Sequence, residues 1–188
     1  MIQSHVILDA KGLACPMPIV KTRKAVKEME PGEVIEVQAT DKGSTADLKA
    51  WADSSGHHYL GTIEKDGHLK HYVRKSAGEE IAETRHPHIV SNEELQAILE
   101  DHAGDIVLDV RESAEYAFSH IPGALSIPLG ELEDQMAALP KGAPIYIVCR
   151  TGNRSDLAAQ QLTEAGFTDV KNVVPGMSAW NGPSEKSI

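Results

Sequence analysis

The chain has 188 residues, 41% of them hydrophobic, and exceeds the roughly 100 to 150 residues of a typical single domain, so two small domains are expected. Its net charge of −10 is concentrated in residues 76–188, whose 18 acidic and 7 basic side chains argue against direct binding of nucleic acid. No stretch approaches the ~18 apolar residues of a membrane span, and the first residues lack the pattern of a secretory signal, so we expect a cytoplasmic protein without membrane contacts.

The first half of the chain alternates between strand and helix patterns. Strands are expected over residues 5–10, 33–39, 58–63 and 69–74. The last two are joined by Asp66-Gly67, a strong hairpin signal. Two segments between the strands, residues 16–29 and 44–55, repeat apolar side chains at helical spacing. The order βαβαββ predicts an open sheet with both helices on one face, which is a two-layer α/β sandwich.

A polar stretch without apolar periodicity, residues 77–87, separates this half from a second half with its own complete set of elements. We interpret this stretch as a linker between a domain of residues 1–76 and a domain of residues 88–188. The two halves differ in the order of their elements, so the sequence contains no internal repeat.

The second half also alternates between strands and helices. Ser91 and Glu94, three positions apart, form a capping box for a helix that ends near residue 100. Strands follow over residues 106–110, 145–149 and 167–173, and helices over residues 131–138 and 154–165. Residues 119–132 form a turn-rich crossing segment, and residues 176–180 a terminal turn or short helix. Strands that alternate with helices predict a parallel, doubly wound sheet.

The two cysteines, Cys15 and Cys149, are 134 positions apart, and the chain has no C-x-x-C pair. A disulfide framework and a thioredoxin-type couple are therefore excluded, and both thiols are expected to be free. The nine histidines include His57-His58 and His86-Pro87-His88, but neither group has the spacing of a complete metal site. We expect no metal.

Cys149 ends an apolar strand and opens a short loop, residues 150–154, before a helix. Open parallel sheets bind ligands at the carboxyl ends of their strands, which is where this loop lies. The loop can direct several backbone N–H groups at the thiol, and Gly152 permits the necessary curl. The helix dipole and two arginines further favour a nucleophilic thiolate. The alternative is a small apolar residue that only fills the core.

Two chemistries fit a cysteine loop that binds anions, and the loop length distinguishes them. Cysteine-dependent phosphatases have a C-x5-R loop around a phosphate, whereas Cys149 and Arg154 are spaced C-x4-R, a tighter loop suited to one sulfur atom. The segments LDVRE, SHIPGA, LSIP, CRTGNRS and GMSAW, in this order over residues 88–182, resemble a single-domain rhodanese. One departure is Pro175 before Gly176, where such domains often have a second glycine.

The resemblance implies a sulfurtransferase in which Cys149 accepts sulfur as a persulfide from thiosulfate or from a protein persulfide. Main-chain groups of Arg150, Thr151, Gly152, Asn153 and Arg154 would hold the outer sulfur. The side chains of Arg150 and Arg154 would bind the donor.

Three residues outside the loop lie in the segments LDVRE and SHIPGA, and the resemblance gives a role to two of them. Asp109 and Arg111, at the end of a neighbouring strand, would support the loop. The alternative for this pair is a local salt bridge at a solvated strand end. His120, in the SHIPGA segment, is interpreted as a structural turn residue rather than a general base.

Cys15 lies where the first predicted strand ends and the first helix begins. It is expected to be the helix N-cap or its neighbour, with Pro16 at the first helical position and Pro18 in the first turn. The helix dipole should favour the thiolate, although the prolines remove two donors and leave Cys15 with fewer than Cys149. An incidental cysteine at a helix start is the alternative.

The pattern DxxGLxCPxP at the first strand–helix turn of a βαβαββ domain is similar to TusA-type (SirA-like) sulfur-carrier proteins over residues 4–75. The resemblance implies that Cys15 accepts sulfur as a persulfide and passes it to a partner protein. The second helix follows Asp41-Lys42-Gly43, where this family more usually has a proline after the aspartate. The difference alters the turn and leaves the thiol in place.

Two sulfur-handling resemblances in one chain favour a sulfur relay. Cys149 would attack a sulfur donor and hold a persulfide, and the Cys15 thiolate would then attack the outer sulfur. The new persulfide would pass to an acceptor protein, and the order of the two cysteines could also be reversed. Because the reaction is thiol exchange, no cofactor is expected beyond the covalent persulfide.

Two other functions remain open at this point. In one, the first domain is a docking module that recruits partners, and only the rhodanese-like domain carries sulfur. In the other, Cys149 serves a cysteine-dependent phosphatase or an arsenate reductase. The sequence does not define the donor, the acceptor or the pathway.

Overall fold

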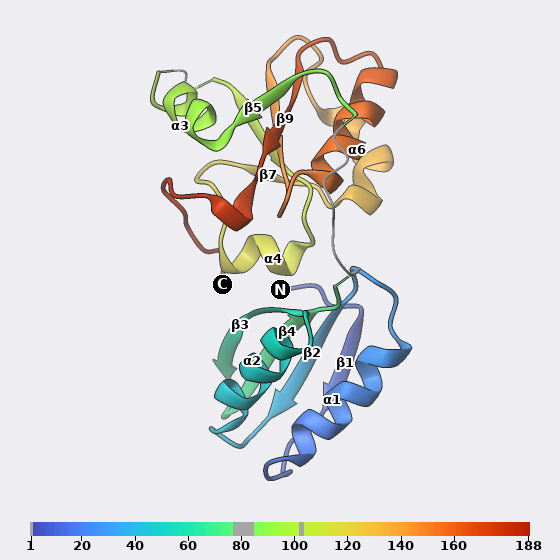
Figure 1. Ribbon diagram of the computed structural model, residues 1–188, viewed down its shortest axis with the longest axis vertical. Helices are drawn as coiled ribbons and strands as arrows, with labels where there is room; N and C mark the ends of the chain where they lie inside the picture. Colours follow the sequence, from blue (N-terminus) through green and yellow to red (C-terminus); the bar gives the residue numbers. More distant parts are fainter. Residues whose placement is uncertain (1, 77–84, 102–103) are drawn as a thin grey trace. The chain divides into compact units, whose positions relative to one another are not determined.

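The computed structural model describes residues 2–76, 85–101 and 104–188. The chain forms two compact units, and the division falls between residues 79 and 80 (Figure 1). Residues 77–84, the greater part of the predicted linker, lie outside the described residues. The residues that follow belong to the second unit, where the backbone amides of Arg85 and His86 each donate to a carboxylate oxygen of Asp156 at 2.9 Å.

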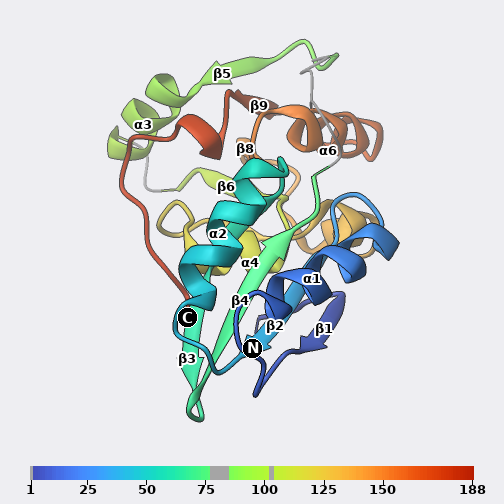
Figure 2. The same cartoon turned by 60° about the horizontal axis from the view of Figure 1, so that its bottom comes forward.

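The first unit is a four-stranded sheet with two helices on one face (Figure 2). Its elements are β1 (Val6–Asp9), α1 (Met17–Glu28), β2 (Val34–Ala39), α2 (Ser44–Ser54), β3 (His58–Lys65) and β4 (His68–Arg74). The strands lie in the order β1-β2-β4-β3, with β1 parallel to β2 and β4 antiparallel to both of its neighbours. The predicted βαβαββ order and two-layer α/β class are confirmed.

The core of the first unit forms where the apolar stripes of both helices meet the sheet. Its buried side chains include Val26, Met29, Ile35, Val37, Leu48, Ala52 and Val73. Burying one such aliphatic side chain contributes about 1.5 to 3 kcal/mol. Leu48 and Ala52, four residues apart on α2, have no exposed surface, so α2 cannot rotate without exposing them.

The second unit is a five-stranded parallel sheet in the order β5-β9-β8-β6-β7. Its strands are β5 (Ile89–Ser91), β6 (Ile106–Asp109), β7 (Leu125–Ser126), β8 (Ile145–Val148) and β9 (Val170–Val174). Its helices are α3 (Asn92–Asp101), α4 (Ser113–Phe118), α5 (Leu132–Gln135) and α6 (Asn153–Glu164), with 3-10 turns at Leu129–Glu131, Met136–Ala138 and Met177–Ala179. The predicted capping box is confirmed, because the Ser91 and Glu94 amides donate to each other's side chains at 2.8 and 3.1 Å.

Strand β8 lies in the middle of this sheet and is buried on both faces. Ile145 and Ile147 pack in a cluster with the inner face of α6, while the alternate residues, Tyr146 and Val148, pack in a separate cluster with α3. Helices therefore cover both faces, which confirms the predicted doubly wound sheet. The carboxyl end of β8 leads directly to Cys149.

Two helices differ from the predicted elements. The helix expected over residues 131–138 is reduced to α5, with a 3-10 turn on either side. Helix α4 lies in a stretch to which the sequence analysis assigned no helix. It begins at a capping box in which the Glu112 amide donates to the Glu115 carboxylate at 3.0 Å. Because Glu is not a preferred N-cap residue, the sequence pattern does not indicate this start.

The helices within the described ranges are all too short or too polar to cross a membrane.

A buried histidine joins α2 to the sheet of the first unit. His71 of β4 has no exposed surface, and its Nε2 lies 2.9 Å from the Ser44 hydroxyl. Its Nδ1 lies 2.9 Å from the hydroxyls of Tyr59 and Thr62. Since the Ser44 hydroxyl donates its own proton to the Asp41 carbonyl at 2.6 Å, its oxygen accepts a hydrogen bond from the N–H at His71 Nε2. Burial lowers the pKa of His71 to about 4, so a neutral ring fixes the start of α2.

The stability of the first unit should fall as the pH decreases from 6.5 to about 4. Because the pKa of His71 is lower in the folded chain than in the unfolded one, the unfolded state binds this proton first and protonation favours unfolding. The shift corresponds to a loss of about 3 kcal/mol, complete below the folded pKa. Urea unfolding at several pH values, followed by Trp51 fluorescence in a Trp180→Phe chain, measures this loss.

The His71→Gln variant is the control, because a glutamine side chain does not titrate. Its free energy of unfolding should decrease by about 3 kcal/mol less than that of the parent over the same pH interval. An equal decrease in both chains would show that the carboxylates, and not His71, cause the acid sensitivity.

Candidate functional site

Cys149 follows β8 and is buried, with 1% of its surface exposed. Two donors contact its sulfur: the Gly152 amide at 3.1 Å and the Ser155 hydroxyl at 3.2 Å. Ser155 lies in the first turn of α6, whose N-terminus adds the positive end of a helix dipole. Because donors stabilise negative charge on an acceptor, this loop suits a thiolate or an anionic persulfide. Ser155, the last residue of CRTGNRS, was not among the predicted site residues.

Gly152 gives the loop its curl before α6, as the sequence predicts. Its φ of 101° lies in the left-handed region, and a Cβ at this position would lie 3.2 Å from the Val174 side chain. Gly152 is the N-cap of α6, and Asn153 is the first helical residue. Arg150 and Thr151 complete the loop between β8 and this cap.

The back of the loop rests against the chain that follows β9. The Met177 amide donates to the Cys149 carbonyl at 2.8 Å. Gly176 has a φ of 81°, and a Cβ there would lie 2.4 Å from the same carbonyl oxygen, so no side chain fits. The buried Asn92 side chain donates to the Gly176 carbonyl at 2.9 Å and accepts from its amide at 3.2 Å. The Cys149 loop is thus held by the Met177 hydrogen bond, which the close approach of the Gly176 backbone allows.

Two further buried polar side chains fix the start of α6. Asn172 of β9 donates to the Gly152 carbonyl at 3.1 Å. Asp156, in the first turn of α6, is 2% exposed and accepts the amides of Arg85 and His86 at 2.9 Å. Neither Asn172 nor Asp156 was predicted, because their partners are remote in the sequence.

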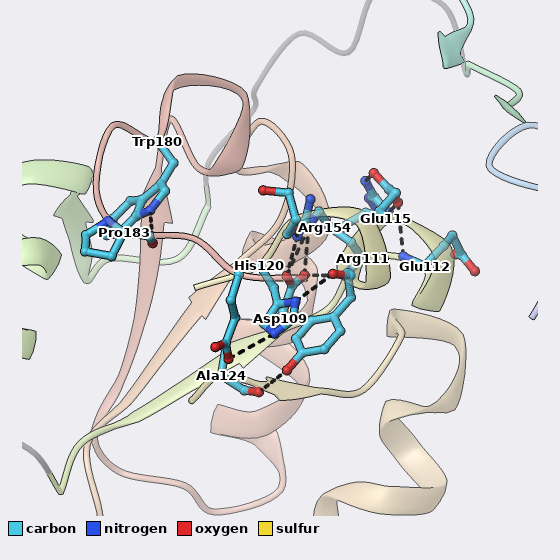
Figure 3. Close-up of polar contacts among 12 residues, drawn as sticks. Asp109, Arg111, Glu112, Glu115, His120, Ala124, Arg154, Trp180 and Pro183 are labelled. Carbon is cyan, nitrogen blue, oxygen red and sulfur yellow. Dashed lines mark hydrogen bonds and ion pairs between the residues drawn. The ribbon is translucent and has the colours of Figure 1, made fainter. Parts of the chain in front are cut away.

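Arg154 joins α6 to α4 (Figure 3). Its terminal nitrogens donate to the Glu115 carboxylate at 2.8 and 3.1 Å, and the two side chains are only 13% and 3% exposed. A bidentate pair of this kind holds both side chains in one orientation. Within the described part of the chain, the Arg150 guanidinium makes no hydrogen bond or ion pair. Of the two predicted donor-binding arginines, Arg150 is therefore the better placed to bind an incoming anion.

Asp109 and Arg111 form a second buried ion pair at the end of β6 (Figure 3). Arg111 donates from Nε and Nη2 to the Asp109 carboxylate at 3.0 and 2.7 Å, and Nη2 also donates to the Ser119 carbonyl at 2.6 Å. The burial of both side chains excludes the alternative that this pair is a solvated salt bridge. Because Ser119 follows α4, the pair supports the helix that carries Glu115, and through it the Cys149 loop.

His120 has a structural role next to this pair (Figure 3). Its ring stacks on Tyr116 with 3.7 Å between the ring centroids, and its Nδ1 lies 2.7 Å from the Tyr116 carbonyl oxygen. Its Nε2 lies 3.3 Å from the Glu185 carboxylate, and the backbones of His120 and Glu185 are also hydrogen-bonded. These contacts join the last residues of the chain to α4, in agreement with the predicted structural role.

The histidine pairs considered as metal ligands make contacts of other kinds. His57 Nδ1 lies 3.4 Å from the Ser76 amide, and His86 Nδ1 lies 3.2 Å from the His88 carbonyl oxygen. In the ranges that the structure describes, no three His, Cys, Asp or Glu side chains are grouped so that they could hold a metal ion.

Cys15 is exposed and lies in the loop between β1 and α1. Pro16, with φ of −98° and ψ of 13°, is the N-cap of α1, so the helix begins at Met17. Pro16 is therefore not at the predicted first helical position, because its backbone lies outside the helical region. Pro18 is buried in the first turn, as predicted.

The Cys15 sulfur contacts a carboxylate instead of donors. Its thiol donates to Asp47 Oδ2 at 3.0 Å. This hydrogen bond, together with desolvation and the charges of Asp47 and Asp41, raises the pKa of the Cys15 thiol. The predicted preference for the thiolate is therefore wrong, because the carboxylate opposes the helix dipole at shorter range. Asp47 lies 32 positions from Cys15, so no local pattern in the sequence predicts this contact.

The two arginines of the loop should differ in their contribution to stability. Arg154→Met should lower the free energy of unfolding of the second unit by about 3 to 5 kcal/mol, because Glu115 stays buried after losing its guanidinium partner. Arg150→Met, the matched control, should change it by less than about 0.5 kcal/mol. Urea unfolding followed by Trp180 fluorescence in a Trp51→Phe chain measures both. Similar effects of the two substitutions would contradict the structural role of Arg154.

Comparison with known proteins gives matches over both units. Residues 6–75 match the family model described as Sulfurtransferase TusA, and residues 91–183 match that of the Rhodanese-like domain. YrkF of Bacillus subtilis (strain 168), whose name describes it as a sulfur carrier protein, is 50% identical over 187 residues, which cover 98% of this chain and 100% of YrkF.

Two further matches each correspond to one unit. YrkI of Bacillus subtilis (strain 168), also described by its name as a sulfur carrier protein, is 51% identical over 74 residues, which cover 39% of this chain and 99% of YrkI. The crystal structure of a rhodanese-like domain protein from Staphylococcus aureus is 32% identical with a TM-score of 0.50, and the match covers 53% of this chain and 97% of that one. The chain therefore belongs to the sulfurtransferase family in which a TusA-type domain is followed by a rhodanese-like domain.

Proposed function

We propose that this protein is a sulfur relay in which Cys149 and Cys15 each carry sulfur as a persulfide. The observation that carries the proposal is the pair of donors at the Cys149 sulfur, the Gly152 amide and the Ser155 hydroxyl. Such donors stabilise an anionic sulfur. The sulfur-carrier name of YrkF, which matches along the whole chain, also supports the relay.

In the first step, the Cys149 thiolate attacks the outer sulfur of thiosulfate or of a persulfide on a donor protein. The S–S bond of the donor breaks, sulfite or the donor thiolate leaves, and Cys149 holds the sulfur as a persulfide. Backbone groups of residues 150–154 and the Ser155 hydroxyl hold the outer sulfur, and Arg150 binds the anionic donor. The exchange of one S–S bond for another needs no metal or organic cofactor.

In the second step, the Cys15 thiolate attacks the outer sulfur on Cys149 of the same or another copy of the chain and releases the Cys149 thiolate. The Cys15 persulfide then delivers its sulfur to the thiolate of an acceptor protein. The exposure of Cys15 supports this role, because a protein acceptor must reach the sulfur. The reverse order, in which Cys15 loads Cys149, uses the same chemistry.

A second candidate is that the first unit only recruits partners and that Cys149 alone carries sulfur. Met17 and Val20, which follow Cys15 on α1, are 45% and 50% exposed, so a partner that covered them would bury apolar surface. A phosphatase or arsenate reductase has less support. Arg154, the arginine that would bind its oxyanion, is paired with Glu115.

Intact mass after treatment with thiosulfate should distinguish the relay from the docking module. The wild-type chain should gain sulfur on both cysteines, because Cys149 is loaded first and then supplies Cys15. Cys15→Ser should gain sulfur on Cys149 only, and Cys149→Ser should gain none. If Cys15 never gains sulfur in the wild-type chain, the first unit is a docking module. If Cys149→Ser loads Cys15 from thiosulfate as the wild type does, the proposed order is wrong.

The Ser155 hydroxyl should contribute directly to sulfur uptake by Cys149. Ser155→Ala should lower kcat/KM for formation of thiocyanate from thiosulfate and cyanide by about 10- to 100-fold, since a hydrogen bond to a charged group is worth about 1.5 to 3 kcal/mol. Ser178→Ala, which removes an exposed hydroxyl from the segment behind the loop, is the control and should leave the rate unchanged. Equal rates in the two variants would remove Ser155 from the proposed mechanism.

A further inference from the structure

Asp47 gives the Cys15 sulfur an environment opposite to that of Cys149. Its Oδ2 accepts the Cys15 thiol proton at 3.0 Å, whereas the Cys149 sulfur accepts hydrogen bonds from the Gly152 amide and the Ser155 hydroxyl. A negative charge on sulfur is therefore stabilised at Cys149 and opposed at Cys15.

Asp47 is held in place by the residues on either side of it in α2. Ser44, one turn earlier, bonds to the Asp41 carbonyl and to the buried His71 ring at 2.6 and 2.9 Å. Leu48, the next residue, has no exposed surface. Rotating α2 to carry the Asp47 backbone away from Cys15 would expose Leu48 and break the Ser44 contacts. The backbone that carries Asp47 is thus fixed, and the hydrogen bond to the Cys15 thiol orients its carboxylate.

The loop that carries Cys15 is fixed separately. The Gly12 amide donates to the Thr40 hydroxyl at 2.9 Å, and the Ala10 amide donates to the Gln38 carbonyl at 2.8 Å. These bonds tie the loop before α1 to the end of β2, which leads into α2. The contact between Cys15 and Asp47 follows from this arrangement of the two strand–helix turns.

Charged groups of both signs lie on the elements around Cys15. Asp47 and Asp41 act on the thiol and raise its pKa. The basic residues of the two loops and of the adjoining part of α1 are Lys11, Lys21 and Lys42. Lys11 lies 3.4 Å from Asp9 in an ion pair. The hydrogen bond to Asp47 is the largest cause of the raised pKa of the Cys15 thiol, followed by desolvation and by the charges of Asp47 and Asp41.

We propose that Asp47 destabilises sulfur held as an anionic persulfide on Cys15 and thereby directs this sulfur to the acceptor. The proposal rests on the proposed function of Cys15 as a sulfur carrier. A persulfide is a stronger acid than the corresponding thiol, so between their two pKa values the loaded site is an anion and the empty site is neutral. Asp47 repels the anion and accepts a hydrogen bond from the neutral thiol, so it favours the state that follows delivery.

The delivery step conserves atoms and electrons. The acceptor thiol loses its proton, and the resulting thiolate attacks the outer sulfur of the Cys15 persulfide. An S–S bond forms on the acceptor, and the S–S bond at Cys15 breaks. The Cys15 thiolate takes up the released proton and again donates to Asp47, while the acceptor carries the persulfide anion. No oxidant or reductant takes part.

The test measures how sulfur partitions between Cys15 and glutathione, with glutathione persulfide as the source. The full chain carries Cys149→Ser, so that one thiol remains, and intact mass gives the loaded fraction. Asp47→Asn, which keeps the shape without the charge, should raise the equilibrium retention of sulfur about 10-fold, because it removes a full negative charge within hydrogen-bond distance of the sulfur. Asp53→Asn, which removes an exposed charge elsewhere on α2, should stay within about 2-fold of the parent.

The effect of Asp47→Asn should depend on pH in a way that a structural defect would not reproduce. It should disappear below the pKa of the persulfide, where both forms are neutral, and above that of the thiol, where both are anionic. Alkylation by iodoacetamide as a function of pH should show a lower pKa for Cys15 in this variant. Asp47→Glu keeps the carboxylate and should restore most of the parental behaviour.

Equal retention in Asp47→Asn and the parent would overturn the proposal, even if the pKa of the thiol were lower. A retention effect of the same size at every pH would overturn it as well. If the parent Cys15 takes up no sulfur from glutathione persulfide, the proposed function itself fails and the proposal falls with it. The alkylation profile would still report the contact between Cys15 and Asp47, so the two failures can be told apart.

Discussion

A sulfur atom that carries negative charge is stabilised by hydrogen-bond donors and destabilised by a nearby carboxylate. The two cysteines of this chain lie at equivalent positions, each after a strand and before a helix, yet their sulfurs have opposite neighbours. At Cys149 the neighbours are the Gly152 amide and the Ser155 hydroxyl, and at Cys15 the neighbour is Asp47. Each side chain that contacts a sulfur comes from the first turns of a helix. The placement of a helix start therefore determines the electrostatics of each site.

The donors at Cys149 depend on contacts that lie outside the loop. The loop backbone is fixed from behind at Gly176, where only a glycine avoids the Cys149 carbonyl oxygen. From the side, α4 is attached to the start of α6 by Glu115 and Arg154, and to the end of β6 by the Arg111 bond to the Ser119 carbonyl. Removing one partner of an ion pair this deeply buried is costly, because the other partner is left as an unpaired charge in the interior. They keep the sulfur and its donors in a constant arrangement.

Local patterns in the sequence predicted most of the fold and both cysteines. The alternation of strands and helices, the turn at Asp66-Gly67 and the motifs around each thiol involve residues only a few positions apart. The contacts that complete the sites join distant residues: 32 positions separate Cys15 from Asp47, 39 separate Glu115 from Arg154, and 84 separate Asn92 from Gly176. With 28 acidic residues in the chain, composition and spacing do not show which carboxylate meets which partner. Only the packing of α2 and α4 against their sheets decides this.

The different burial of the two cysteines suits them to different partners in the proposed relay. With 1% of its surface exposed, Cys149 would react more readily with a small donor such as thiosulfate than with a bulky one. Cys15 is exposed next to Met17 and Val20, an apolar surface that a protein can cover. Apolar contacts do not depend on the charge of the sulfur, so a partner can bind this surface whether Cys15 is loaded or empty. If a partner binds α1, its contacts and the effect of Asp47 on α2 would involve separate groups, and a change in one would not have to weaken the other.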